Sequence, residues 1–278
     1  MNKSISPSKR KASLLLVSSL ALGFPLSAQA TDLCGQIITA DTKLDEDQRC
    51  SGNGITIGAD NIALNCDGHS LSGPGTPLRG GPPTIGIALN GRKGVTVKNC
   101  NVTGFARAGI LLSNSSHNKI INNDAPRNST VGISLTLSSH NKLGENTANG
   151  NRAGGIVLQG SSYNKLTENT ATANGDLEFP GGSVIFSASG ISLFSSSHNR
   201  LIDNTANDNQ AHGILLIQSS DRNRLTDNTA DGNARDGIEL EDSSRNKLRD
   251  NVANNNGGAG ASGSPSAGFA IEGSSTKN

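Results

Sequence analysis

Residues 132–151 read GISLTLSSHNKLGENTANGN, and this stretch decides the fold. It opens with Gly and an apolar, any, apolar triplet, passes through a Ser pair, and then places Asn at three positions five residues apart. The same pattern occurs in six units, with a repeat of about 23 residues. Such a unit is too short to fold alone and must bury its apolar side against its neighbours, which predicts a solenoid.

The repeat predicts two short strands per coil and no helix. The triplet after each Gly has the period-two pattern of a strand, and the Ser pair marks a turn into a second strand with a basic and an aliphatic residue. Equivalent strands of successive coils stack in parallel about 4.8 Å apart, so each repeated residue type forms a column. We therefore expect an all-β solenoid of about nine coils.

The asparagine columns predict structural side-chain ladders. Asn accepts left-handed backbone angles, and its amide can bond to the same amide one coil above and below. A glycan-binding strip is the alternative interpretation. The ladder residues are Asn118, Asn123, Asn128, Asn141, Asn146, Asn151, Asn164, Asn169, Asn174, Asn199, Asn204, Asn209, Asn223, Asn228, Asn233, Asn246, Asn251 and Asn256.

The N-terminus has the features of a secretory signal peptide over residues 1–30. Basic residues within positions 3–11 precede an apolar run over residues 14–26, and Ala28-Gln29-Ala30 is a small-residue cleavage pattern. Cleavage would change the formal charge from +1 to about −3, which disfavours nucleic acid as a partner. We expect a periplasmic or secreted protein, and no later apolar run is long enough to span a membrane.

The four cysteines also favour export, because disulfides persist in oxidising compartments. Cys34, Cys50, Cys66 and Cys100 allow three connectivities. Sequence proximity, and the position of Cys66 and Cys100 in adjacent coils, favours the pairs Cys34–Cys50 and Cys66–Cys100. These bonds would fix the start of the solenoid.

The glycine-led repeats and the opening stretch 54–73 resemble the right-handed parallel β-helix repeats of the NosD-like and pectate-lyase-like superfamily. The resemblance covers residues 54–278, after a cap segment at 31–53. It implies a right-handed parallel β-helix and leaves activity open, because lyases, hydrolases, epimerases, accessory and surface proteins share this scaffold. NosD itself is an accessory of periplasmic copper-enzyme maturation, which implies copper as one candidate cofactor.

Two insertions and the C-terminus interrupt the regular pattern. Insertions at 175–186 and 257–266 follow the third Asn of their units, so we expect both loops at one edge of the solenoid, where they could flank a shallow groove. Residues 268–275 begin another coil that has no cap after it. This end predicts end-to-end self-association or an incomplete chain.

The repeat also produces charged and ring-bearing columns. A basic residue follows the first Asn of every unit, and an acidic residue comes three positions later in five of the six units. We expect the two columns to neutralise each other on a solvated face, with an acidic polysaccharide as the alternative partner of the basic column. His117 and His140 occupy one turn position in neighbouring coils and are candidate copper or zinc ligands.

A polysaccharide hydrolase would require converging carboxylates, whereas a lyase would require a basic residue near a calcium site. The best candidates are Glu239, Glu241 and Asp242, near His212 and Arg235. Further acids on the same or adjoining coils are Asp208, Asp236 and Glu272. The residues match no catalytic motif of polygalacturonases or calcium pectate lyases. For binding, Phe194, Leu215 and Ile217 form an apolar patch on outward strand positions, and the loop that carries Phe179 and Phe186 could cover it.

The leading prediction is therefore an exported β-helix that binds polysaccharide or another extended partner, such as a protein, along its side. A polysaccharide lyase or hydrolase is the first alternative. A NosD-like accessory protein of copper-enzyme maturation is the second.

Overall fold

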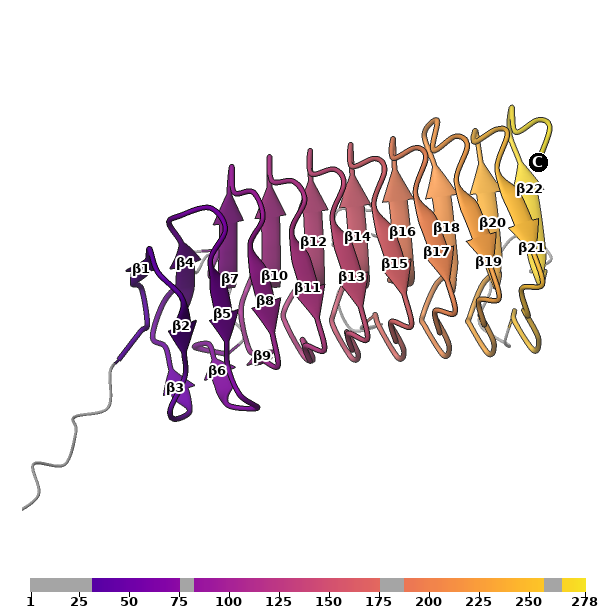
Figure 1. The fold of residues 1–278 in the computed structure, drawn as a ribbon. Coiled ribbons are helices and arrows are strands. Elements are labelled where there is room, and N and C mark those ends of the chain that lie inside the picture. The colour runs from indigo at the N-terminus through magenta and orange to yellow at the C-terminus, as the bar shows by residue number, and fades with distance from the viewer. Residues whose placement is uncertain (1–31, 76–82, 176–187, 258–266) are drawn as a thin grey trace, which may run out of the picture. The chain divides into compact units, whose positions relative to one another are not determined.

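The structure, a computed structural model, describes residues 32–75, 83–175, 188–257 and 267–278 (Figure 1). The predicted signal peptide, Phe179 and Phe186, and almost all of the second insertion lie outside these ranges. Within them every named element is a β-strand, and no helix is long and apolar enough to cross a bilayer.

The strands form three parallel sheets that run along the stack of coils. The first sheet contains β1 (Ile37–Ile38), β4 (Ile55–Ile57), β7 (Ile85–Asn90), β10 (Ala108–Ser113), β12 (Val131–Thr136), β14 (Gly154–Gln159), β16 (Ser189–Phe194), β18 (Ile214–Ile217), β20 (Ile238–Glu241) and β22 (Phe269–Glu272). The second contains β2 (Thr42–Lys43), β5 (Ala63–Asn65), β8 (Thr96–Lys98), β11 (Lys119–Ile121), β13 (Lys142–Gly144), β15 (Lys165–Thr167), β17 (Arg200–Ile202), β19 (Arg224–Thr226) and β21 (Lys247–Arg249). The third contains β3 (Gln48–Arg49), β6 (Ser70–Ser72) and β9 (Asn101–Thr103).

This arrangement confirms the parallel β-helix. Equivalent repeat positions pair directly, as Ile110 with Ile133 and Lys119 with Lys142. The segment predicted as a cap, residues 31–53, contributes β1, β2 and β3, which pair in parallel with β4, β5 and β6. It therefore forms the first coil.

The core is a set of aliphatic columns inside the coils. Ile133 and Leu135 of β12 and Leu143 of β13 are at most 1% exposed, whereas Ser134 between the first two faces outward. The repeat glycines are required where the coil closes on itself. A Cβ on Gly190 would lie 2.7 Å from the carbonyl oxygen of Ala171 and 2.7 Å from Nδ2 of Asn209, distances at which the backbone would have to move.

The asparagine ladders are present as predicted. Asn146, 1% exposed, accepts hydrogen bonds on Oδ1 from both the backbone N and Nδ2 of Asn123, each at 3.0 Å. Its Nδ2 donates to the carbonyl of Ile120 at 2.8 Å and to Oδ1 of Asn169 at 2.9 Å. Each amide therefore joins three coils and satisfies turn backbone that water cannot reach.

The expectation that the ladder asparagines themselves take left-handed backbone angles is wrong. The left-handed residue is the one immediately before each ladder Asn, as at His140, Glu145 and Ala173 with φ of 61°, 54° and 53°. This turn residue points its side chain outward, whereas the Asn keeps an ordinary φ and turns its amide inward. The energetic cost of left-handed residues is offset by the ladder bonds beside them.

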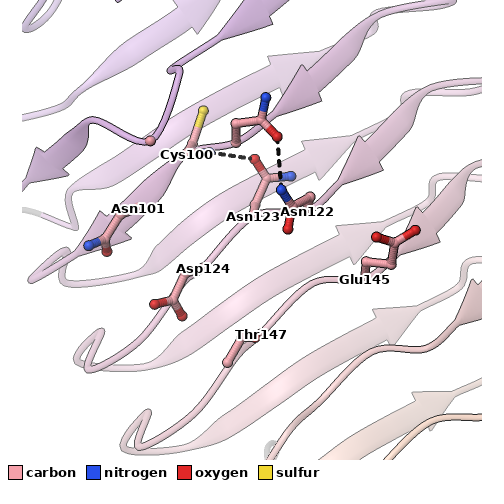
Figure 2. A pocket seen from close by; sticks show the side chains of 9 residues that line it. Cys100, Asn101, Asn122, Asn123, Asp124, Glu145 and Thr147 are labelled. Carbon is pink, nitrogen blue, oxygen red and sulfur yellow. Dashed lines mark hydrogen bonds between the residues drawn. The ribbon is translucent and has the colours of Figure 1, made fainter.

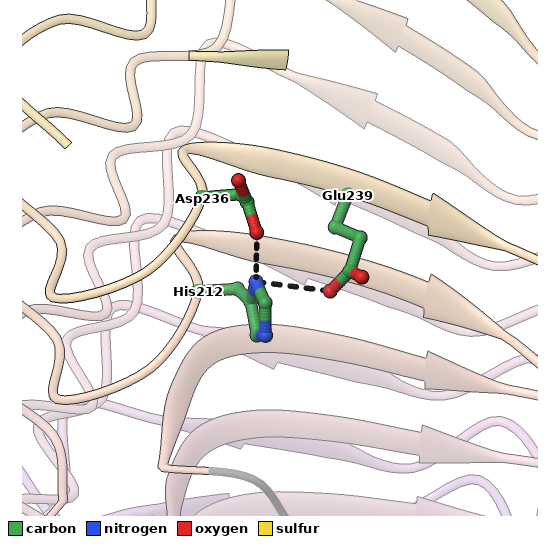
Figure 3. Close-up of side chains that lie close together, drawn as sticks. All are labelled: His212, Asp236 and Glu239. Carbon is green, nitrogen blue, oxygen red and sulfur yellow. Dashed lines mark ion pairs between the residues drawn. The ribbon is translucent and has the colours of Figure 1, made fainter. Parts of the chain in front are cut away.

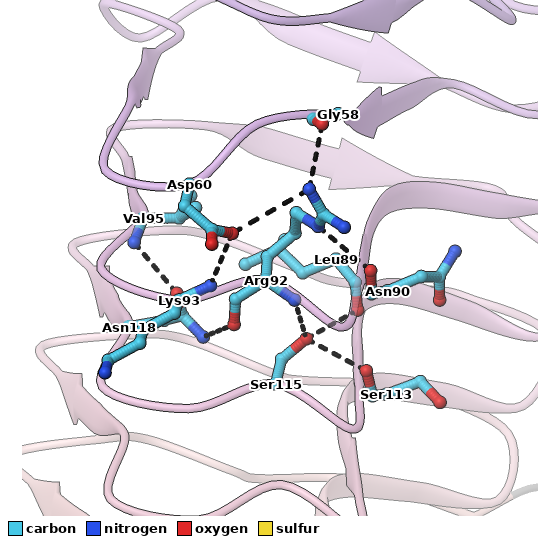
Figure 4. Close-up of polar contacts among 10 residues, drawn as sticks. All are labelled: Gly58, Asp60, Leu89, Asn90, Arg92, Lys93, Val95, Ser113, Ser115 and Asn118. Atoms are coloured by element: carbon cyan, nitrogen blue, oxygen red, sulfur yellow. Dashed lines mark hydrogen bonds and ion pairs between the residues drawn. The ribbon is translucent and has the colours of Figure 1, made fainter.

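A second ladder comes from the Ser pair, which the sequence indicated only as a turn. Ser115 is 1% exposed, and its Oγ accepts from the backbone N of Arg92 at 2.9 Å. Its own backbone N donates to Oγ of Ser138 at 3.0 Å in the next coil. Figure 4 shows the start of both ladders, where Asn118 donates to the carbonyl of Arg92 at 3.0 Å.

Both predicted disulfides are present. Cys34 bonds to Cys50 within the first coil, and Cys66 bonds to Cys100 across adjacent coils. No free cysteine remains. The bonds therefore cross-link the N-terminal end of the described solenoid.

Candidate functional site

A histidine and two carboxylates converge on the outer face of the first sheet (Figure 3). Nδ1 of His212 lies 3.0 Å from Oε2 of Glu239 and 3.3 Å from Oδ2 of Asp236. We call these three residues the His212 cluster. His212 is 5% exposed, Glu239 8% and Asp236 9%, so all three ionisable side chains are almost completely shielded from water.

The strand register brings the cluster together. His212 and Asp236 stand two residues before Ile214 and Ile238, which pair directly across β18 and β20. They therefore occupy the same position in consecutive coils. Glu239 lies one residue after Ile238, at an outward position of β20 opposite Leu215.

The hydrogen bonds of the cluster are incomplete. Oδ1 of Asp236 accepts a hydrogen bond of 2.6 Å from the backbone N of Ala267, and this bond orients the carboxylate. Nδ1 of His212 is fully buried and makes no hydrogen bond to any residue that the structure describes, because neither nearby carboxylate has the required geometry. One nitrogen and two oxygens that face each other in this way can bind a metal ion, or can move a proton between an imidazole and a carboxylate.

The predicted catalytic residues are separated by this arrangement. Glu239 joins His212 and Asp236, whereas Glu241 and Asp242 are exposed. Oδ1 of Asp242 accepts from the backbone N of Ser274 at 2.8 Å, in a turn contact between coils. The sequence indicated Asp236 as one of the acidic residues of this region and His212 only as a residue near them. His212 and Asp236 occupy the same position in consecutive coils, and this pattern in the sequence could have predicted the His212 cluster.

A column of rings marks the turn between the first and second sheets. The rings of His117 and His140 are parallel, with centroids 5.1 Å apart, and Tyr163 and His198 continue the stack at 5.1 Å and 4.8 Å. The lone pairs of a ring lie in its plane, so the parallel planes of His117 and His140 do not direct two nitrogens at one point. Copper or zinc binding there stays a prediction and would require the rings to rotate.

Two columns beside each other form what we call the lateral strip. The first is the ring column, which Arg222 and Arg245 continue at the same turn position. The second is the basic column, two residues further along each unit, and all six of its side chains are exposed. The basic column comprises Lys119, Lys142, Lys165, Arg200, Arg224 and Lys247.

The expected neutralisation of the basic column by the acidic column is not found. Across the described residues, none of the six cations forms an ion pair. The acidic residues, such as Glu145 and Glu168, lie at the turn after each strand, three residues on and roughly 10 Å away at strand spacing. The six cations are therefore free to attract an external anion.

The predicted apolar patch is not an open surface. Phe194 and Leu215 are 5% and 3% exposed, and Ile217 is half buried. Phe194 packs with Val131 and Val157 in a second apolar cluster outside the coils, and Ile217 packs against it. The binding role predicted for Phe194, Leu215 and Ile217 therefore concerns residues that are largely covered.

A shallow polar hollow of about 230 Å³ lies between the second and third sheets (Figure 2). Its lining includes Asn101 and Asp124, each of which has a buried Oδ1 without a hydrogen bond to a described residue. Burial raises the pKa of the Asp124 carboxyl above its usual value, and the charge of Arg127 opposes this only in part.

The fold and these sites define an all-β solenoid with polar outer faces, and the comparisons with known proteins agree. The chain belongs to the family described as periplasmic copper-binding protein (NosD), whose model matches residues 32–185, more than half of the chain. Residues 181–278 match the right handed beta helix region. A comparison with curated proteins finds no match.

Solved structures share the fold at low sequence identity. The periplasmic alginate epimerase AlgG has a TM-score of 0.60 at 16% identity, covering 76% of this chain and 50% of that chain. The A-module of the Azotobacter vinelandii mannuronan C-5 epimerase AlgE6 has a TM-score of 0.57 at 14% identity, and the match covers 81% of this chain and 59% of that chain. The alginate lyase from Paenibacillus sp. has a TM-score of 0.51 at 11% identity, and the match covers 87% of this chain and 91% of that chain. The chain thus spans about half the length of AlgG, and these likenesses show the fold alone.

Proposed function

We propose that the protein is exported and binds an acidic polysaccharide along the lateral strip. The observation that carries the proposal is a row of six exposed cations in strict register, none of which forms an ion pair with a described residue. Parallel strands repeat every 4.8 Å or so, so the row offers a positive charge at each step along the coil axis. A polymer with regularly spaced carboxylates is the complement of such a row.

The adjoining ring column supports the same ligand. His117, His140 and Tyr163 are exposed, and their stacked rings present polar edges to solvent at intervals of 5.1 Å. Ring edges with N–H and O–H groups can donate to sugar hydroxyls or carboxylates. Cations and donors side by side suit an extended anionic glycan better than a compact ligand.

The structural neighbours support this ligand class. AlgG, the AlgE6 module and the Paenibacillus lyase are named for alginate or mannuronan, and alginate is an acidic polysaccharide. The family description adds the periplasm, and the two disulfides fit an oxidising compartment.

Binding of alginate oligosaccharides by calorimetry, with a neutral glucan as reference, tests the proposal. We expect alginate binding that weakens as salt is raised and no binding of the neutral glucan. The variant Lys142→Gln with Lys165→Gln should weaken binding about 5- to 30-fold, if each exposed cation contributes about 0.5–1 kcal/mol.

A matched control removes two exposed cations elsewhere, by Arg49→Gln with Arg107→Gln. It makes the same change in net charge and should bind alginate like the unmodified protein. Equal weakening in both double variants would mean that net charge, rather than the lateral strip, attracts the polymer. Absence of alginate binding would remove the proposal.

A polysaccharide-processing enzyme is the second candidate, and the His212 cluster favours it. An imidazole between two carboxylates is a suitable acid–base group for cleavage or epimerisation of a uronate. Incubation of the protein with alginate, with detection of unsaturated or reducing ends, measures lyase or hydrolase activity. Product that disappears in Glu239→Gln and persists in Glu241→Gln would support this function.

A role as an accessory protein of copper-enzyme maturation rests on the family description. Copper titration with and without the substitutions His117→Gln and His140→Gln tests the ring column as the site. Equal copper binding by the variant would remove these two residues as ligands.

A further inference from the structure

We propose that the His212 cluster binds one divalent transition-metal ion on the outer face of the first sheet. The three candidate donor atoms, one imidazole nitrogen and two carboxylate oxygens, all lie within 4.8 Å of one another. The lateral strip lies at a different face of the coil and takes no part in this site. The proposal of metal binding is therefore independent of the proposal of polysaccharide binding.

The missing hydrogen bond of His212 is the first argument. Buried side-chain nitrogens are almost always satisfied by a hydrogen bond, and an orphaned one destabilises the fold. Nδ1 of His212 is orphaned although two acceptor oxygens lie at 3.0 and 3.3 Å. A neutral imidazole that directs its lone pair at the space between two carboxylates has this geometry, and a cation in that space would satisfy all three groups.

The charge of the cluster is the second argument. Glu239 and Asp236 are 8% and 9% exposed, and in the described parts of the chain neither pairs with a lysine or an arginine. Two buried carboxylates with one imidazole have at most one positive charge among them. Such a site is costly without a counter-ion, and a dication supplies the missing charge.

The distances suit a transition metal. Ligand bonds of about 2.0–2.2 Å at tetrahedral angles place donor atoms about 3.3 Å apart. The two nitrogen-to-oxygen distances are already 3.0 and 3.3 Å, and closure requires the two carboxylate oxygens to approach by no more than about 1.5 Å. The bond from the backbone N of Ala267 orients the Asp236 carboxylate, as hydrogen bonds commonly orient metal ligands.

The donor set selects the class of ion. Imidazole with carboxylates suits Zn²⁺ and Cu²⁺, whereas Ca²⁺ takes six to eight oxygen ligands. Copper, which the family description names, belongs to the favoured class. Three protein ligands leave a tetrahedral position for water or for another group.

Titration of chelator-treated protein with Zn²⁺ in a calorimeter, with the bound metal measured by mass spectrometry, tests the site. We expect one Zn²⁺ per chain, displacement by Cu²⁺, and weaker binding of Mn²⁺. The near-isosteric changes Asp236→Asn and Glu239→Gln should each weaken Zn²⁺ binding about 100-fold. The control Glu241→Gln, an exposed carboxylate on the same strand, should leave binding unchanged.

Thermal unfolding separates a metal site from a structural network. Free Zn²⁺ at 100 times its Kd should raise the Tm of the unmodified protein by about 5–10 °C. Glu239→Gln should raise the Tm of the metal-free protein, because it removes an uncompensated charge, and should reduce the rise with the same Zn²⁺ concentration to about 1–2 °C. A Glu239→Gln variant that is less stable without metal would identify a structural network and overturn the proposal.

Two binding results would also overturn it. The first is the absence of Zn²⁺ and Cu²⁺ binding in the unmodified protein. The second is binding that persists in Asp236→Asn and Glu239→Gln. Neither result depends on whether alginate binds the lateral strip.

Discussion

Substitution of a ladder asparagine in the middle of its column should destabilise the protein strongly. In Asn146→Leu, the backbone N–H of Asn123 loses the Oδ1 that it donates to at 3.0 Å, and three other ladder bonds are lost. The orphaned N–H costs about 1–3 kcal/mol and each further bond about 0.5–1 kcal/mol. Burial of the leucine methyl groups returns about 1–2 kcal/mol, which leaves a loss of about 3 kcal/mol in the free energy of unfolding.

This loss corresponds to a decrease in Tm of about 6–12 °C for a chain of this size. Thermal unfolding followed by circular dichroism measures it, and hydrogen exchange reports the opening of the Asn123 amide directly. The matched control is Asn254→Leu, at an exposed position whose side chain makes no hydrogen bond to a described residue, with an expected change within about 0.5 kcal/mol. Equal stability of the two variants, with the Asn123 amide still protected, would refute the ladder as a source of stability.

Three other perturbations follow from the described contacts. Asp124→Asn should stabilise the protein at neutral pH, because the raised pKa of Asp124 in the folded state means that its ionised carboxylate is unfavourable there. Protonation of Asp124 removes this cost, so the gain in stability should disappear as the pH is lowered. Urea unfolding at several pH values measures the gain. Replacement of both Cys66 and Cys100 by alanine should cost about 4 kcal/mol in denaturant unfolding, since their bond closes a loop with a sequence separation of 34; an unchanged midpoint would contradict this. Gly190→Ala should prevent a stable fold, because the new Cβ would lie 2.7 Å from a carbonyl oxygen. Ala173→Gly should instead stabilise the protein by about 0.5–1 kcal/mol, because φ at this position is 53°. Equal melting temperatures of the two variants would contradict these roles of the two backbone positions.

The fold could be predicted from the sequence because each coil repeats the same local rules. The spacing of Gly, paired apolar residues and Asn indicated strands, turns and ladders, and the register of β10, β12 and β14 follows that spacing. The backbone geometry of the turns could not be read in the same way. Asn is among the non-glycine residue types that best tolerate left-handed angles, but its amide is needed inside, so the preceding residue takes that conformation.

The candidate site was predictable only in part. Glu239 was selected for its acidic neighbours, but its burial and its contact with His212 depend on the outward positions of two coils together. Whether the apolar patch is exposed could not be predicted for a related reason. Alternation along a strand predicts which face Phe194 lies on, but it does not predict whether that face is covered.

The sequence by itself determined the solenoid and the ladders, because both follow from a short repeat that stacks in parallel. It favoured one of three disulfide pairings, and the structure shows that pairing. The tertiary structure decided which outward residues meet, which are covered and which remain unpaired. A single coil carries no information on these points, since each depends on side chains from neighbouring coils and on distances of a few ångströms. The unpaired basic column and the His212 cluster are therefore properties of the stack, and both proposals about function rest on them.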